Sequence, residues 1–446
     1  MTIIKLNKLF EKNNDNIFFN KFEEYLLKSL SFAILLFPLS LLSGPFIPDL
    51  IISLSSLFFL YISSKHKLNV YYNNFLIKIL LIFWLYLVFS SLFSDNIFFS
   101  LKSSFFYFRF ILFSIFIFFL LERYNNFIVY FFYSLILAYL IVVIDSLIQF
   151  YFGVSFTGNL KPNLRLTGPF GDRQIVGSYL SRLFPLLLFI FFILKKKINF
   201  NLFVFFALIS LTILFSGERT ALFMFNLIFF LMLFIYFKSK KKFFIVFLIY
   251  VLSILILVFS NKDLKQRIFV NTLQSFGLVK FVDTDGMNKY FEAKSEKNFY
   301  IISQAHEWHY QTALKMFFDN PLIGVGPNMF RKKCSDDKYY IAVPSCTTHP
   351  HNFLIQILAE TGIIGAIFYL FLFFLNLFQI LKAIFLNKIK NVYSNYLYCS
   401  FFLNIGFFIN IFVFILPNGN FFNNYLNSVI YLPLGFYLYL NKYKNV

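Results

Sequence analysis

The chain has 446 residues, of which 59% are hydrophobic and only 13% are charged. A soluble domain usually has about 45–50% apolar and about 25% charged residues, so the composition excludes an ordinary soluble protein. The net charge of +20 could suggest nucleic-acid binding, but the lysines gather in short clusters between apolar runs, not on one face of a domain. We therefore expect a membrane protein with no nucleic-acid partner.

Twelve apolar runs approach membrane length, which requires about 20 mainly apolar residues. They lie at residues 26–44, 46–63, 75–93, 104–121, 127–151, 174–194, 198–215, 219–237, 243–260, 362–385, 395–416 and 425–440. No small-residue cleavage site follows the first run, so we expect it to be retained as a membrane helix. The sequence predicts an all-α polytopic membrane protein. Its parts are an N-terminal bundle over 1–260, a long loop with short helices over 261–352, and C-terminal membrane helices over 353–446.

The placement of Lys and Arg predicts the orientation of these spans. The even-numbered loops and the C-terminal tail are basic, whereas the short odd loops at 44–46 and 417–424 carry no positive charge. Both termini are therefore expected in the cytoplasm, and the 261–352 loop is expected outside.

Three arginines at outward ends of spans depart from this rule: Arg165, Arg173 and Arg219. Arg165 suits a solvated loop equally well. Arg219 follows the tight turn at 216–218 and begins a membrane helix, where an unpaired charge is costly. Either Glu218 or a bound anion could compensate it, and we favour an anion site.

Within the spans, Arg109, Asp145 and Arg182 are candidates for functional groups, because charge in the bilayer is costly. A structural ion pair between Asp145 and Arg182 is the alternative interpretation.

The long loop contains a helical pattern from about residue 303 to 318. Its apolar positions fit one broad face: Ala305, Trp308, Leu314, Phe317 and Phe318. Asn320-Pro321 ends this helix, and residues 324–327 form a tight turn. The GVG of this turn lacks the Lys-Ser/Thr ending of a nucleotide-binding loop.

Cys334 and Cys346 are the two cysteines of the loop, and Cys399 falls in a span. An oxidising compartment permits a disulfide between the loop cysteines. A zinc site is the alternative, but the H-x-H spacing of His349 and His351 departs from common zinc patterns. We predict the disulfide, and no metal or cofactor.

The segment at 348–365, THPHNFLIQILAETGIIG, is the most specific part of the loop. Asn352, Gln356 and Glu360 recur every four residues and form a polar stripe on an apolar helix. The helix N-terminus disfavours an imidazolium at the preceding histidines. A neutral imidazole there could act as a general base, although surface histidines are a simpler interpretation.

Four stretches give the chain a resemblance to the O-antigen ligase and polymerase superfamily of bacterial envelope glycosyltransferases. They are LTGPFGDRQIVGSYLSRLFPLLL at 166–188, FSGERTALF at 215–223, DNPLIGVGPNMFR at 319–331 and HPHNFLIQILAETGIIG at 349–365. The resemblance implies a protein of the bacterial inner membrane. It would transfer a glycan from undecaprenyl diphosphate to an acceptor hydroxyl at the periplasmic face, without nucleotide or metal.

The resemblance also implies roles for residues. Arg219 and Arg173 would contact the diphosphate, and His351 would be the base of an inverting single displacement. His306 stands where related proteins often have Arg, and Arg331 could compensate for that difference. The other predicted substrate-binding residues are His349, Asn352 and Glu360.

Membrane lipids and a lipid-linked glycan donor are thus the expected partners. The favoured acceptor is lipid A–core, as for a ligase. A polymerase acting on another glycan repeat is the first alternative, and a polysaccharide transporter or flippase is the second.

Overall fold

A computed structural model describes residues 18–162, 164–195, 200–237, 239–279, 299–390, 395–413 and 416–442. Within these ranges the regular structure is helical, apart from isolated bridge residues such as the pair Val154 and Leu160. The predicted all-α class is confirmed. Part of the predicted long loop, residues 280–298, lies outside the described residues.

The helices before the long loop are α1 (Lys21–Leu35), α2 (Phe37–Ser40), α3 (Phe46–Lys65), α4 (Phe75–Ser91), α5 (Ile97–Ser104), α6 (Phe108–Arg123), α7 (Phe127–Phe152), α8 (Val176–Ile193), α9 (Phe200–Phe215), α10 (Arg219–Tyr236) and α11 (Lys240–Ser260). Those of the loop are α12 (Lys262–Leu264), a π-helical turn (Lys265–Val270), α13 (Asn271–Ser275), α15 (Gln304–Asp319) and α16 (Phe330–Lys333). The last are α17 (Phe353–Lys390), α18 (Asn395–Phe407), a π-helical turn (Phe408–Phe412) and α19 (Asn424–Lys442).

Seven helical segments of the described chain are long and apolar enough to cross a membrane: α3, α5 with α6, α7, α8, α10, α11 and the first 33 residues of α17. The α1–α2 pair adds an eighth if it is one span bent by 59°. Pro38 at the start of α2 explains the bend, because proline cannot donate the helical hydrogen bond. The chain is an integral membrane protein. The other four predicted spans coincide with α4, α9, α18 and α19, which are shorter or less apolar.

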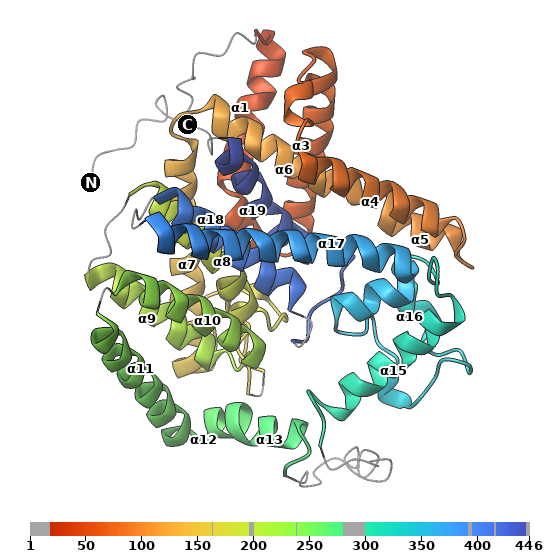
Figure 1. The fold of residues 1–446 in the computed structure, drawn as a ribbon. Helices are drawn as coiled ribbons and strands as arrows, with labels where there is room; N and C mark the ends of the chain where they lie inside the picture. The colour runs from red at the N-terminus through yellow and green to blue at the C-terminus, as the bar shows by residue number, and fades with distance from the viewer. Residues whose placement is uncertain are drawn as a thin grey trace.

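Burial separates central helices from peripheral ones. The most apolar window of α8 is 83% buried and that of α5–α6 is 78% buried, whereas α11 is only 6% buried. Helix α6 packs against α3 and α19, and α8 packs against α10 and α18. Helix α11 lies at the edge of the molecule, and α17 crosses its middle (Figure 1).

The apolar face predicted for the loop helix is partly wrong. Trp308 is buried as expected, but Phe318 is 74% exposed. The face of α15 that packs against α17 instead contains His309, Thr312, Ala313 and Met316. The reason is that the partner surface, at the start of α17, is itself partly polar, so polar side chains of α15 are buried against it.

Ion pairs join helix ends that are far apart in sequence. Lys65 at the end of α3 contacts Glu23 of α1 at 2.6 Å, and Lys442 at the end of α19 contacts Glu122 of α6 at 2.6 Å. All four helix ends belong to the side of the bundle that the charge pattern predicts to be cytoplasmic.

Candidate active site

The start of α17 is a strained turn that fixes the backbone of His351. His351 has φ 59°, a left-handed value that is uncommon for residues other than glycine and that asparagine, aspartate and histidine adopt more often than other side chains. Its carbonyl accepts a hydrogen bond from the Asn418 N–H at 2.8 Å. Asn352 caps the helix, because its Oδ1 accepts from the Ile355 N–H at 3.1 Å. The imidazole of His351 is thereby held just ahead of the helix.

Four histidine rings meet at this point. The ring centre of His351 lies 4.1 Å from that of His349, 5.3 Å from that of His309 and 5.4 Å from that of His306. Helix α15 supplies His306 and His309, one helical turn apart. The structure thus brings together the predicted His306, His349 and His351. The sequence reasoning missed His309, which the i, i+3 spacing from His306 could have indicated.

The histidines of this cluster favour the neutral form. Burial, and then the neighbouring His309, lower the pKa of His351 to about 4. Burial, His351, His309 and Arg219 lower the pKa of His306 to about 4. A similar combination lowers the pKa of His349 to about 3. At neutral pH these imidazoles are uncharged and can accept a proton.

A group of three arginines includes Arg219, which is close enough to His306 to lower its pKa. Arg219 donates to the Asn271 carbonyl and the Thr272 hydroxyl, both at 3.0 Å, and to the Ser275 hydroxyl at 3.2 Å. Arg267 donates to the Gly217 carbonyl at 3.1 Å, and Arg165 donates to the Gln174 carbonyl at 2.9 Å. These hydrogen bonds all go to neutral groups. Burial, together with Arg219 and Arg165, lowers the pKa of Arg267 to about 10.

Glu218 is the carboxylate beside these arginines, but its hydrogen bonds lead elsewhere. It accepts from the backbone N–H groups of Gly177 at 2.7 Å and Ser178 at 3.0 Å, and so caps the N-terminus of α8. Burial raises the pKa of Glu218 to about 7. One partly protonated carboxyl cannot balance three cations. The arginine group therefore keeps a positive charge that suits an anion.

A cavity of about 690 Å³ includes Arg331 in its wall, and Arg331 is close enough to His349 of the cluster to lower its pKa. The cavity is lined by Pro45, Asp49, Phe99, Lys102, Ser103, Phe106, Tyr107, Arg109, Phe110, Arg173, Asn328, Arg331, Asn420, Phe422, Asn423, Asn424 and Tyr425. Arg173 and Arg331 are thus together in the cavity wall, whereas Arg219 lies in the arginine group. The predicted cations are divided between two places.

Glu360 supports the cavity wall from within the protein. Its side chain is fully buried and accepts from the Asn328 N–H at 3.0 Å, the Phe330 N–H at 2.8 Å and Gln356 Nε2 at 3.0 Å. Gln356 also donates to Asn420 at 2.9 Å. The predicted polar stripe of α17 therefore holds Asn328, Phe330 and Asn420 in place through hydrogen bonds.

The turn before α16 packs directly on the backbone of α17. The N–H groups of Val325 and Gly326 donate to the carbonyls of Ala359 and Glu360 at 3.0 and 2.9 Å. A Cβ on Gly324 would come within 2.4 Å of the Glu360 backbone. Helix α17 is kinked at Gly362, which has φ 64° and ψ −166°. These glycines allow two backbone segments to touch, and the contact fixes the position of Arg331.

Cys334 and Cys346 are joined by a disulfide, with their Cα atoms 4.9 Å apart. Cys346 directly follows Ser345, whose backbone is hydrogen-bonded to His309. Cys399 is free and buried. No set of three or more His, Cys, Asp or Glu side chains within the described ranges is arranged to hold a metal ion.

The charged groups predicted inside the spans have separate partners. Arg109 pairs with Asp49 at 2.7 Å. Asp145 accepts from the Phe156 N–H at 2.5 Å. Arg182 donates to the Asn410 carbonyl at 3.2 Å and to Asn418 Oδ1 at 3.1 Å. The alternative of an Asp145–Arg182 ion pair is therefore wrong. Arg182 instead supports the segment that bonds His351.

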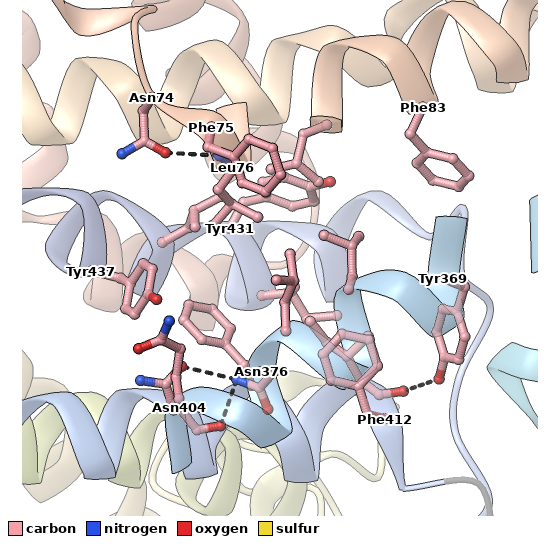
Figure 2. A pocket seen from close by; sticks show the side chains of 18 of the residues that line it. Asn74, Phe75, Leu76, Phe83, Tyr369, Asn376, Asn404, Phe412, Tyr431 and Tyr437 are labelled. Atoms are coloured by element: carbon pink, nitrogen blue, oxygen red, sulfur yellow. Dashed lines mark hydrogen bonds between the residues drawn. The ribbon is translucent and has the colours of Figure 1, made fainter. Parts of the chain in front are cut away.

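A second, mostly apolar pocket of about 260 Å³ lies between α4, α17, α18 and α19 (Figure 2). Asn376 donates to the carbonyl and the side chain of Asn404, both at 3.1 Å, and Tyr369 donates to the Ile411 carbonyl at 2.6 Å. Tyr107 lines both this pocket and the larger cavity. The described residues that line this pocket include no carboxylate or imidazole, so the pocket suits an apolar group and not acid–base chemistry.

Comparison with known protein families gives one match: residues 202–370 match the family model described as O-Antigen ligase. This segment runs from α9 into α17 and contains Arg219, the histidine cluster and the disulfide. The stretch at 166–188 lies outside it. No curated protein matches the chain. The predicted resemblance is confirmed.

Proposed function

Because residues 202–370 match the family model described as O-Antigen ligase, we propose that this chain is a membrane glycosyltransferase that takes its glycan from a polyprenyl diphosphate. The observation that carries the proposal is that the ring of neutral His351 lies 5.4 Å from that of His306, which is in turn within the electrostatic influence of Arg219 in the arginine group of Arg165, Arg219 and Arg267. A diphosphate leaves with two negative charges or more, so positive charge that is already in place stabilises its departure. A neutral imidazole is the base that such a transfer needs.

The chemistry follows as one displacement. His351 takes the proton of the acceptor hydroxyl, and the oxygen forms a bond to the anomeric carbon of the donor sugar. The bond from that carbon to the diphosphate oxygen breaks, and its electron pair leaves with the polyprenyl diphosphate. Arg219 binds the leaving group, and the anomeric configuration inverts. The proton on His351 then passes to water.

The proposal includes the topology. The chain would have twelve spans with both termini in the cytoplasm, in the inner membrane of a bacterium. The described parts of the 261–352 loop would face the periplasm with the site. In favour of this topology, several loops between helices that are predicted to face outward line one cavity. They contribute Pro45, Arg173, Asn420 and Asn423. The donor would be undecaprenyl diphosphate.

The proposed acceptor is lipid A–core, which makes the chain a ligase. The alternative is a polymerase that adds to another glycan repeat. A gel of surface glycan separates them. Loss of a ligase leaves long glycan on its lipid carrier, whereas loss of a polymerase leaves one repeat on the acceptor.

The test of the enzyme is substitution of the base and of the leaving-group contact. His351→Asn is the preferred variant, because asparagine tolerates the left-handed backbone that alanine does not. We expect His351→Asn to lower glycan transfer by about 10²–10⁴-fold, the usual contribution of a general base. Arg219→Ala should also abolish transfer. Both variants should reach wild-type levels in the membrane.

Lys315→Gln is the matched control, since Lys315 is an exposed cation on α15 away from the histidine cluster. It should transfer glycan normally. Normal surface glycan in His351→Asn and Arg219→Ala, at normal protein levels, would refute the proposed function.

A further inference from the structure

The larger cavity carries an excess of positive charge. Lys102, Arg109, Arg173 and Arg331 line it, against Asp49. Asp49 pairs with Arg109 at 2.7 Å. Within the part of the chain that the structure describes, no carboxylate forms an ion pair with Lys102, Arg173 or Arg331. These three cations favour an anionic ligand.

The rest of the lining suits a sugar. Amide and hydroxyl groups can both donate to and accept from sugar hydroxyls, and they come from Ser103, Tyr107, Asn328, Asn420, Asn423, Asn424 and Tyr425. Phe99, Phe106, Phe110 and Phe422 offer rings for the apolar face of a sugar. The hydroxyl of Tyr425 is buried, and no hydrogen-bond partner for it lies among the described residues. Such a group is expected to bond a ligand or water.

Two of these amides are held rigidly. Asn328 donates to the Ser103 hydroxyl at 3.0 Å, and its Oδ1 accepts from Asn420 at 3.0 Å. Asn420 is in turn held by Gln356, which is bonded to Glu360. This chain of hydrogen bonds fixes one wall of the cavity before a ligand enters, which lowers the ordering cost of binding. The volume of about 690 Å³ is within the usual range of about 300–1,000 Å³ for ligand sites.

The cavity and the arginine group reach His351 through different neighbours. His306, at 5.4 Å from His351, is under the influence of Arg219. His349, at 4.1 Å from His351, is under the influence of Arg331. Asn418, two residues before Asn420 of the cavity wall, bonds the His351 carbonyl. His351 therefore has one cationic site next to each of two neighbouring histidines.

A transferase with a single base needs its acceptor and its leaving group in two separate sites. We propose that the larger cavity is the acceptor site and that it takes a saccharide bearing a phosphate or carboxylate group. Arg173 and Arg331 bind that anion, while Arg219 binds the diphosphate of the donor. This inference rests on the proposed function, and it reassigns Arg173 from the leaving group to the acceptor.

The experiment measures binding without turnover. The full-length protein in lipid nanodiscs is titrated calorimetrically with a de-acylated core oligosaccharide bearing phosphate, with the same oligosaccharide after phosphatase treatment, and with one bearing uronate. A second titration uses undecaprenyl phosphate. We expect the wild type to bind at least one charged saccharide about tenfold more tightly than the neutral one. Whichever of the phosphate-bearing and uronate-bearing saccharides binds more tightly identifies the anionic group that the cavity prefers.

The variants separate the two sites. Arg331→Gln and Arg173→Gln should each weaken binding of the charged saccharide at least about tenfold. They should change binding of undecaprenyl phosphate less than twofold. Arg331→Lys should restore part of the loss, because it restores the charge. Arg219→Gln should weaken binding of undecaprenyl phosphate and leave binding of the charged saccharide nearly unchanged. Lys315→Gln should change neither affinity.

Two results would overturn the inference. One is equal binding of charged and neutral saccharides by the wild type. The other is that Arg331→Gln and Arg173→Gln weaken binding of undecaprenyl phosphate and leave binding of the charged saccharide unchanged. Both results come from binding measurements and do not depend on transfer activity. The proposed function fails in a different way, namely if the His351→Asn variant still transfers glycan normally. The two failures can therefore be distinguished.

Discussion

Four of the chain's five histidines meet at the start of α17, where burial lowers the pKa of each ring and neighbouring histidines lower the pKa of His306, His349 and His351 further. Protonation of any ring in the cluster disfavours protonation of its neighbours, and burial disfavours all the charged forms. His351 consequently has a pKa of about 4, well below the usual value of 6.5. A base must be unprotonated, so its activity is present above its pKa and is lost as the pH falls through it.

The pH profile of transfer tests this arrangement. For the wild type, we expect kcat/KM to stay level from neutral pH down to about pH 5 and to fall only near pH 4. His309→Asn should move this fall to higher pH, because it removes a neighbour that lowers the pKa of His351. His66→Asn is the control, since His66 contacts Glu23 of α1 and not the cluster. A wild-type fall centred at pH 6.5 would contradict the low pKa.

At the level of residues, the sequence predicts candidate site residues where a motif or a departure from the charge pattern marks them. His351 precedes a helix start within a specific motif, and Arg219 departs from the charge rule. Arg165 and Arg267 join Arg219 only through contacts between distant segments. Glu218 is adjacent to Arg219 in sequence, yet its carboxylate points to the N-terminus of α8. Such partners depend on packing, which a single sequence does not specify.

At the level of elements, apolar runs predict the membrane helices well because each run must bury or solvate its side chains in lipid. The loop helix α15 is harder, since its partner surface is partly polar. The kink of α17 is the second feature that the apolar pattern does not predict. A glycine in an apolar membrane helix indicates close packing with a neighbouring element and does not by itself predict a turn. The structure adds that the backbone turns there, and that Pro321 accepts a hydrogen bond from the Ile363 N–H at 2.8 Å.

A pair of glycine variants tests the importance of this kink. In Gly153→Ala the residue would have φ 77°, with no atom within 4 Å of the new Cβ, so only left-handed strain of about 1–2 kcal/mol is expected. In Gly362→Ala the new Cβ would lie 2.3 Å from the Leu322 carbonyl oxygen. The backbone there also has a combination of φ and ψ that is essentially confined to glycine. We expect a clearly larger fall in Tm for Gly362→Ala than for Gly153→Ala, together with loss of transfer.

Thermal unfolding of both variants in one detergent provides the measurement. The comparison removes the cost of a positive φ, which both positions have, and leaves the extra backbone strain at Gly362 together with the collision with the 321–326 turn. Equal falls in Tm would mean that the turn yields without cost, and that the contact between the turn and α17 does not position Arg331.

At the level of the whole molecule, ion pairs connect segments that are far apart in sequence on both sides of the bundle. Lys65 with Glu23 and Lys442 with Glu122 join the helix ends that the charge pattern predicts to be inside. On the side predicted to be outside, Lys333 of the long loop pairs with Asp95, which precedes α5. The two groups of contacts agree with one orientation, although they are formed by segments far apart in sequence.

Labelling of introduced cysteines tests that orientation directly. The native thiols give little background, because Cys334 and Cys346 are bonded to each other and Cys399 is buried. Each new cysteine replaces an exposed residue. Ser43→Cys and Asp337→Cys should react with a membrane-impermeant maleimide on intact spheroplasts. Lys67→Cys and Lys241→Cys should react only after the membrane is permeabilised. If Asp337→Cys were protected while Lys67→Cys reacted, the site would face the cytoplasm, and a donor presented at the periplasmic face could not reach His351.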